Sequence, residues 1–376
     1  MQNTDDTFSW DPESDQIFDF PGETTLRGPA ETFNKIHGCG LDVYGITPDA
    51  TQLGPLILVP DSAEPGVINW GVPSAATINS RFQFWEKADF RILGHRQLKN
   101  ISVTDGTDTL EPCILHFNLF DDSCVRLENL QSVILGTSKL ETMTSIDFSG
   151  IQTSSFFILA ETIGLFYKAT LSGHSTLDVQ ARAISTNGFY GAELYGLCFN
   201  DYSSLLLNAR LMQHVDSELI LQSSLSFHDS SHGNICARSI HNDVPDNNIG
   251  DFVAIDAFDN STVDIHTAQF LQGTGKGKII QLSGNANVTI NPLNNITPIN
   301  PVEEVLNPTE KCWPGMFNFK SGSKAVLKLN GNAIGTVYNV NALYILNLFY
   351  IDGSPVDIRD KFIIDYDSNG LTIKLK

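Results

Sequence analysis

Positively charged residues are scarce in this chain of 376 residues. Lys and Arg together number 23 against 43 Asp and Glu, which gives a formal net charge of −20 at pH 7. Because such a charge repels phosphate backbones and anionic bilayers, we do not expect nucleic acid as a partner. Charged residues make up 18% of the chain, below the roughly 25% typical of soluble domains. Small hydroxyl and amide side chains fill the outward positions instead, as is common in extended β proteins.

The chain also lacks a long apolar run. No stretch reaches the ~18 apolar residues of a membrane span. The nearest, Val337 to Ile351, is interrupted by Asn339, Asn341 and Asn347 and is interpreted as buried strand. The N-terminus shows neither the basic nor the apolar region of a Sec signal peptide. No membrane span is expected, and the cytoplasm, a virion and export by a non-classical route stay open as locations.

Paired cysteine motifs are absent as well. The six cysteines form no CxxC pair and have no metal-type spacing to histidine. They are Cys39, Cys113, Cys124, Cys198, Cys236 and Cys312. We predict that they are free and mostly buried, and we predict no metal and no cofactor. No GxSxG motif supports serine hydrolase chemistry.

A short repeated motif is the clearest signal that is present. An aromatic residue, a polar turn of Asp and Asn, a Ser and then an alternating apolar strand occur at 120–127, 199–207 and 258–265. Related strands carry an outward Asp: Asp147, Asp178 and Asp264. A unit this small cannot bury its own apolar face, so the copies are expected to stack.

The spacing of the motif suggests a repeat length. Phe120 to Phe199 is 79 residues and Phe199 to Phe258 is 59, close to four and three turns of about 20 residues, at the lower end of known solenoid periods. Asp105-Gly106 and Asn187-Gly188 are hairpin-type turns, so an antiparallel meander or sandwich remains an alternative. A stacked solenoid is favoured because a sandwich does not explain why the strand recurs at multiples of one length.

These strands resemble the rungs of the right-handed parallel β-helix. The resemblance rests on the Ser-x-Leu-x-Val pattern followed by small polar residues, as in 175–181, and covers roughly 101–329. The group includes pectin-lyase-like enzymes, phage tailspikes and secreted adhesins. It implies an all-β, single-stranded parallel β-helix. The catalytic motifs of its pectin-degrading members, with paired Asp, Gly-His-Gly and Arg-Ile-Lys, are not found in this chain.

The expected organisation has five parts, each inferred from composition and proline spacing. They are an acidic, loose N-terminal arm (1–37) that pins Phe18 and Phe20, an irregular N-terminal cap (38–100), β-helix rungs (101–291), a proline-spaced linker or excursion (292–322), and C-terminal rungs with a β cap (323–376). In the cap, aromatic residues cluster around Trp70 and Trp85. They are interpreted as part of a cover over the first open edge of the stack, with a glycan-stacking platform as the alternative.

Two groups of residues are candidates for chemistry. The turn residues Asp121, Asp122, Asp201 and Asp259 would align along one edge of a stack, where they are interpreted as turn formers. Residues 227–252 are the longest departure from the repeat and are expected to loop out of it. The binding candidates in that loop are His228, His232, Arg238, His241 and Asp243. A plain polar loop, acid/base chemistry and metal coordination are all open for it.

We therefore expect a non-enzymatic, elongated binding or adhesion protein that presents lateral loops to a surface, a glycan or a protein partner. One alternative is a polysaccharide lyase or glycoside hydrolase. Its candidate catalytic residues are Asp201, His228, Asp229, Asp251 and Asp256. Another is a self-assembling structural protein, trimeric like a tailspike or filament-forming. A homo-oligomer would then form through the apolar C-terminal strands.

Overall fold

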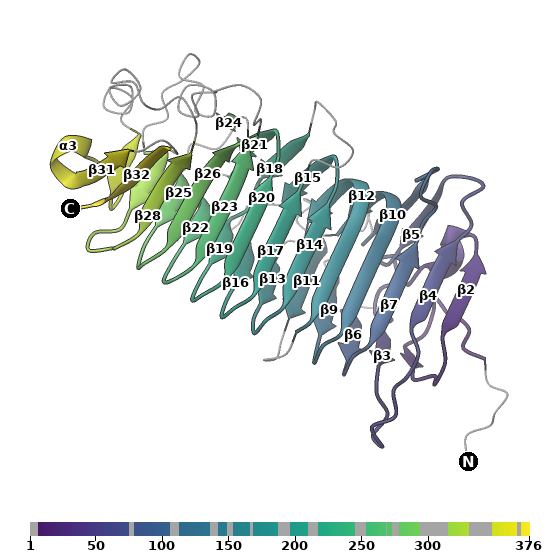
Figure 1. The fold of residues 1–376 in the computed structure, drawn as a ribbon. Helices are drawn as coiled ribbons and strands as arrows, with labels where there is room; N and C mark the ends of the chain where they lie inside the picture. The colour runs from purple at the N-terminus through teal and green to yellow at the C-terminus, as the bar shows by residue number, and fades with distance from the viewer. Residues whose placement is uncertain are drawn as a thin grey trace. The chain divides into compact units, whose positions relative to one another are not determined.

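The computed structural model describes residues 7–376 with gaps. The described ranges are 7–74, 79–105, 113–135, 142–148, 153–165, 168–186, 196–209, 217–244, 253–267, 269–272, 278–293, 315–330, 348–366 and 370–376. The chain divides into two compact units, Met1–Val179 and Gln180–Lys376. Each unit contains a sheet A and a sheet B, built mostly of parallel strands (Figure 1). The fold is all-β.

Unit 1 contributes strands to both sheets in alternation. In sheet A they are β1 (Gln16–Phe18), β3 (Leu41–Tyr44), β6 (Ser80–Trp85), β9 (Cys113–Leu119), β11 (Thr142–Phe148) and β13 (Lys168–Leu171). In sheet B they are β2 (Thr24–Gly28), β4 (Leu56–Pro60), β5 (Gly66–Asn69), β7 (Asp89–Leu93), β8 (Ile101–Thr104), β10 (Cys124–Ile134) and β12 (Ser155–Leu165). The last strand, β14 (Thr176–Gln180), ends at the boundary between the units, and the short helix η1 spans Ala30–Phe33.

Unit 2 repeats this alternation. Its sheet A strands are β16 (Leu197–Phe199), β19 (Leu225–Phe227), β22 (Val253–Ala257), β25 (Lys278–Leu282), β27 (Phe317–Phe319), β29 (Phe349–Ile351) and β30 (Ser354–Pro355). Its sheet B strands are β15 (Ala183–Thr186), β17 (Ser204–Asn208), β18 (Glu218–Leu221), β20 (His232–Cys236), β21 (Ser239–Asn242), β23 (Thr262–Thr267), β24 (Gln269–Gln272), β26 (Asn287–Pro292), β28 (Val326–Asn330), β31 (Phe362–Tyr366) and β32 (Gly370–Leu375). One helical turn, α3, spans Ile358–Lys361.

The strand register corrects the expected repeat length. In sheet A of unit 2, Phe199 pairs with Phe227 and Phe227 pairs with Ala257. Phe199 and Phe258 are therefore two repeats apart, not three, and one repeat is about 30 residues long. The estimate of 20 was wrong because a repeat contains three strands, such as β19, β20 and β21. The intermediate copy, which starts at Phe227, was missed because the first residue of the turn differs among the copies, where Asn200, His228 and Phe258 are equivalent.

The register also explains the apolar alternation. Leu207, Ile235, Ile265, Ile290 and Leu329 occupy the same position on successive strands of sheet B and are all at most 4% exposed. Side chains at alternate positions point to the same face of a strand, so equivalent residues form one buried column. Fully burying each is worth roughly 1.5–3 kcal/mol.

The recurring Ser occupies a buried position at the end of each turn. Ser123, Ser203, Ser231 and Ser261 are all fully buried. In each turn the Ser N–H donates to the carbonyl three residues earlier. Other turns of the same form end in Ala88 or Ala286, also fully buried. The position therefore requires a small side chain more than it requires a hydroxyl group.

Parallel pairing excludes the antiparallel sandwich as a description of the units. Antiparallel strand pairs are seen in the described residues only near the C-terminus, between β28 and β32, β31 and β32, and β29 and β30, apart from a single bridge between Ile46 and Gln52. The predicted hairpins of this C-terminal part are confirmed for Asp352-Gly353, where both residues have positive φ. Asp105-Gly106 and Asn187-Gly188 extend outside the described residues.

The segment 38–100 was expected to be an irregular cap, and this is wrong. It supplies strands β3 to β7, which continue the parallel ladders into β6, β7, β8, β9 and β10. Its prolines lie at strand ends and in connections, where a missing N–H does not interrupt a ladder. Trp70, Phe82, Phe84 and Phe90 are at most 1% exposed, so they form part of the core.

The N-terminal arm is not loose in residues 7–37. It supplies β1 and β2, which pair with β3 and β4, and Phe18 is buried and stacked on Phe20 as predicted. The fully buried Lys35 holds the arm: its Nζ donates to the carbonyls of Asp11 and Ser14 at 2.6 and 2.8 Å and to Gln16 Oε1 at 2.9 Å. An ammonium group has three donors, so all three are used.

The register makes a first testable prediction. Ser226 lies beside Cys198 on the neighbouring parallel strand, where Cα atoms about 4.8 Å apart suit a disulfide. We expect Ser226→Cys to form a disulfide with Cys198 under mild oxidation, detected by peptide mass mapping. The matched control is Glu218→Cys, which a 20-residue repeat would place beside Cys198. Cross-linking of the control in place of Ser226→Cys would contradict the register.

Lys35 makes a second prediction. Burial lowers the pKa of Lys35 from 10.5 to about 8, while the charges of Cys39, Asp11 and Asp15 act in the opposite direction. Between these two values the unfolded chain holds a proton that the folded chain has lost, so the free energy of unfolding rises with pH. Urea unfolding should show the wild-type value rising against that of Lys35→Met by up to about 1.4 kcal/mol per pH unit above pH 8. A constant difference would show that Lys35 does not titrate in this range.

Candidate functional site

The predicted residues His228 and Asp229 lie in a turn and not in a loop. The turn connects β19 to β20, and the His228 carbonyl accepts the Ser231 N–H at 3.0 Å. Asp229 has φ 53°, in the left-handed region. The expectation that residues 227–252 leave the repeat is therefore wrong up to residue 244, because β20 and β21 pair on both sides. Residues 245–252, with Asp251, lie outside the described residues.

Three turns of this form stack in unit 2 and bring the predicted Asp residues together. The Asp201 N–H donates to Asp229 Oδ2 at 3.1 Å, and the Asp229 N–H donates to Asp259 Oδ2 at 3.2 Å. All three Asp residues have φ between 52° and 55°, and Gly284 takes the same place in the next turn with φ 59°. We call this set the turn column. Its carboxylates bind backbone N–H groups, as the interpretation as turn formers predicts.

The other predicted residues are spread over the repeat. His228 stacks on Phe258, with ring centroids 4.5 Å apart and planes 7° apart. His232 begins β20, whereas His241 lies in β21 and Asp243 follows that strand. The Arg238 N–H donates to Ser217 Oγ at 3.1 Å. Within the described residues no three His, Cys, Asp or Glu side chains are grouped so that they could hold a metal ion.

Asp256 belongs to a separate polar chain across sheet A of unit 2. Gln281 Nε2 donates to both Asp256 carboxylate oxygens at 3.1 Å, and Asn318 Nδ2 donates to Gln281 Oε1 at 2.8 Å. The Gly353 N–H then donates to Asn318 Oδ1 at 2.8 Å. Gln281 and Asn318 are buried. A buried amide chain with satisfied partners stabilises the register of its strands.

An aromatic column runs along the ends of the sheet A strands in unit 1. Tyr44 stacks on Trp85 at 6.3 Å and Trp85 stacks on Phe120 at 4.1 Å, with planes 11° and 13° apart. Trp85 stacks on both neighbours, and Tyr44 and Phe120 each turn one ring face toward it. Sugars bind aromatic residues through the ring faces, and this arrangement therefore suits turn stabilisation better than a glycan-stacking platform.

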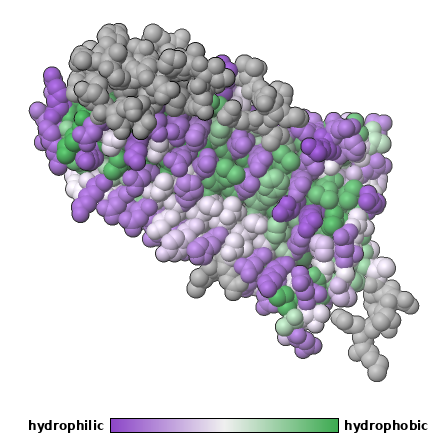
Figure 2. Space-filling model, in the orientation of Figure 1, coloured by the Kyte–Doolittle hydropathy of each residue, from purple (hydrophilic) through white to green (hydrophobic). Residues whose placement is uncertain are grey.

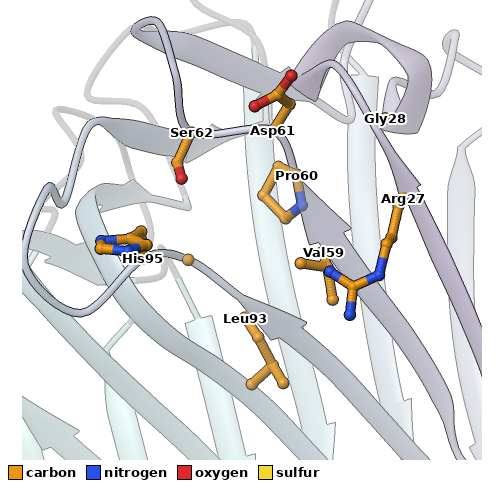
Figure 3. Close-up of a pocket in the computed structure, with 9 residues that line it drawn as sticks. Arg27, Gly28, Val59, Pro60, Asp61, Ser62, Leu93 and His95 are labelled. Carbon is orange, nitrogen blue, oxygen red and sulfur yellow. The ribbon is translucent and has the colours of Figure 1, made fainter.

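A pocket occupies a different part of unit 1, where sheet B strands end. Its walls are Arg27 and Gly28 at the end of β2, residues 59–62 after β4, and residues 93–95 after β7, and its volume is about 500 Å³. We call it the corner pocket. Figure 3 shows Arg27 on one side, His95 and Ser62 on the other, and Pro60 and Val59 between them. In Figure 2 green apolar surface alternates with purple polar surface on this side of the strands.

The corner pocket exists because two connections are longer than the fold requires. Residues 61–65 join β4 to β5, and residues 94–100 join β7 to β8. In unit 2 the equivalent connection, between β20 and β21, is only Ala237-Arg238. In unit 1, β10 is one continuous strand at this corner and has no connection there. We call residues 61–65 and 94–100 the corner loops.

Hydrogen bonds hold the corner loops in place. Asn100 Nδ2 donates to the Ser62 carbonyl at 2.6 Å, which joins one loop to the other. The Gln97 and Leu98 N–H groups donate to His95 Nδ1 at 3.3 and 3.2 Å. Because Nδ1 accepts, the neutral His95 ring carries its proton on Nε2. Lys99 forms an ion pair with Glu161 on β12. The loops are therefore pre-organised.

The lining of the corner pocket combines polar groups with apolar surface. Arg27, His95 Nε2 and Ser62 supply donors, Asp61 supplies a carboxylate whose Oδ1 accepts the Ala63 N–H at 3.1 Å, and Val59 and Leu93 supply apolar surface. Such a mixture of apolar surface with a few polar groups is typical of small-molecule sites. Sequence reasoning missed it. The one available signal was that two connections in 38–100, one of them ending in Pro65, are longer than a tight turn needs.

Comparison with protein-family models, curated proteins and solved structures gives no match. Among the described residues, no helix is long and apolar enough to cross a membrane.

Cys39, Cys124, Cys198 and Cys236 are free, as predicted, but half-buried where we expected burial. Residue 312 and the side chain of residue 113 lie outside the described part of the chain.

The turn column makes a third prediction. Asp229→Ala should lower the free energy of unfolding by about 1–2.5 kcal/mol, because it loses a hydrogen bond and places a Cβ-bearing residue without compensation at φ 53°. Asp229→Gly should cost less, since glycine adopts this φ freely. Urea denaturation measures both, with the exposed Ser230→Ala as control. Equal losses for Ala and Gly would argue against the backbone role.

Proposed function

We propose that this chain is a parallel β-helix that binds a saccharide, without catalysis, through the corner pocket of unit 1. The β-helix is supported by the repeated passage from a sheet A strand through one or two sheet B strands, with parallel pairing at each repeat. In such a fold the strands supply a scaffold and the corner connections supply recognition.

The corner loops are the observation on which the binding function rests. They are extra chain at corners that the fold closes with two residues between β20 and β21 and with none in β10, although residues 209–217 between β17 and β18 form another long connection. They are also tied to each other and to β12. Pre-organised loops bind with a smaller loss of conformational entropy than loops that must order on binding.

The lining favours a saccharide over a purely apolar ligand. A sugar ring has apolar C–H faces that fit against Pro60 and Leu93, and hydroxyl groups that need both donors and acceptors. His95 Nε2–H and the Ser62 hydroxyl provide donors, and the Asp61 carboxylate provides an acceptor. A volume of about 500 Å³ lies within the 300–1,000 Å³ usual for small-ligand pockets and accommodates a short oligosaccharide.

A glycan array with the full chain tests the proposal. We expect at least one class of glycan to bind, and His95→Asn to weaken that binding about three- to tenfold in titration calorimetry. Asn retains an acceptor near the Nδ1 position while it loses the Nε2 donor, and one hydrogen bond is worth about 0.5–1.5 kcal/mol. The matched control is Gln97→Ala in the same loop, which should bind like the wild type.

A second variant addresses the loops themselves. Replacing residues 94–100 by Ala-Arg, the connection between β20 and β21, should abolish binding while thermal unfolding stays cooperative. Absence of any bound glycan, or full binding by this variant, would refute the proposed site. Shortened or unsaturated sugars in the mixture, detected by mass spectrometry, would refute the non-enzymatic part and favour the lyase or hydrolase.

A further inference from the structure

The outer edge of β2 carries a self-complementary sequence. β2 is the last strand of sheet B in unit 1, beyond β4 (Figure 1), and β4 is its one partner strand in the described residues. The segment from Glu23 to Arg27 reads Glu-Thr-Thr-Leu-Arg. If two copies pair antiparallel about Thr25, Glu23 of one lies opposite Arg27 of the other. Opposite charges at directly opposed positions stabilise a strand pair.

The backbone N–H and C=O groups that β2 directs away from β4 are the ones that such pairing requires. The Thr24 N–H donates to the Pro55 carbonyl, and the Gly28 carbonyl accepts the Asp61 N–H. The even-numbered residues of β2 therefore direct their N–H and C=O groups toward β4. Because alternate residues of a strand bond to opposite sides, Glu23, Thr25 and Arg27 direct theirs outward. These are the residues that a pairing centred on Thr25 would place in hydrogen-bonded pairs.

The edge is open to pairing with a second copy along residues 23–27. Natural edge strands are protected by proline, bulges, covering segments or charged side chains, and the charges here, Glu23 and Arg27, complement those of a second copy. Pro21 and Pro29 flank β2, but residues 23–27 contain no proline. Their register with β4 is regular over Thr24 to Gly28. Arg27 is exposed, forms no hydrogen bond or ion pair within the described residues, and is free to meet a carboxylate of a second chain.

We propose that two copies of this chain associate through the outer edges of β2, antiparallel about Thr25. Each Thr25 exchanges N–H and C=O bonds with its counterpart. Each Glu23 does the same with the Arg27 backbone of the other copy, and their side chains form an ion pair. The arrangement is a two-fold symmetric, isologous interface. It is separate from the C-terminal strands considered from sequence. Arg27 also lines the corner pocket, but the pairing rests on the backbone and charges of the β2 edge and not on the pocket.

Mass measurement by light scattering, coupled to size exclusion, tests the pairing in the full chain. The wild type should show twice the monomer mass of 41.3 kDa and dissociate on dilution. Glu23→Arg and Arg27→Glu should each weaken the dimer at least tenfold, since each opposes like charges. The double variant Glu23→Arg/Arg27→Glu should restore it. A dimer that is indifferent to all three variants would overturn the proposal, as would a wild type that is monomeric at 100 μM.

Thr25→Pro separates the interface from folding. Its N–H points away from β4, so proline removes an intermolecular donor and leaves the β2–β4 ladder intact. We expect a monomer with an unchanged unfolding midpoint. Thr24→Pro is the matched control, because it breaks the bond to Pro55 and should lower the midpoint. A Thr25→Pro variant that remains dimeric would place the interface elsewhere, for example at the C-terminal strands.

Discussion

The hydrogen bonds between one turn and the next turn above it are the interaction on which both units depend. Each turn must place one residue in the left-handed region and end in a small buried side chain. When these conditions hold, the following strand enters sheet B in the same register as its predecessor. Asp201, Asp229 and Asp259 satisfy the first condition, and their carboxylates add a bond to the adjacent turn. The inward columns of Leu, Ile and Phe then follow from the register alone.

Much of the strand pattern could be predicted from sequence, because alternation and turn residues are local signals. Ser175 to Val179, Ser261 to Ile265 and Phe362 to Tyr366 are strands whose ends lie within two residues of expectation. The repeat length could not be read in the same way. The copy that starts at Phe227 was not recognised, because the first residue of the turn is Asn200 in one copy, His228 in the next and Phe258 in the third. His228 stacks on Phe258 as a phenyl ring would. The turn geometry tolerates this variation, whereas a search for one residue type does not.

The candidate site was less accessible to sequence reasoning. Titratable residues drew attention to 227–252, but their density there reflects outward positions of ordinary strands and a turn. The corner pocket joins residues near 27, 60 and 94, which come together only through parallel stacking of β2, β4 and β7. Without the register no pattern indicates that Arg27 and His95 line the same space. Prolines in 38–100 suggested irregularity, whereas they mark the ends of strands.

The constant repeat has a consequence for how the chain folds. Partners in sheet A of unit 2 are separated along the chain by similar lengths, from Leu197 to Leu225, Leu225 to Ile255, and Ile280 to Phe317. The entropy of closing a loop rises only with the logarithm of its length, so each repeat costs nearly the same to add. Parallel sheets usually fold slowly because their contacts are distant in sequence. Here every strand needs only its immediate predecessor as a template, and folding can start within a unit and proceed repeat by repeat.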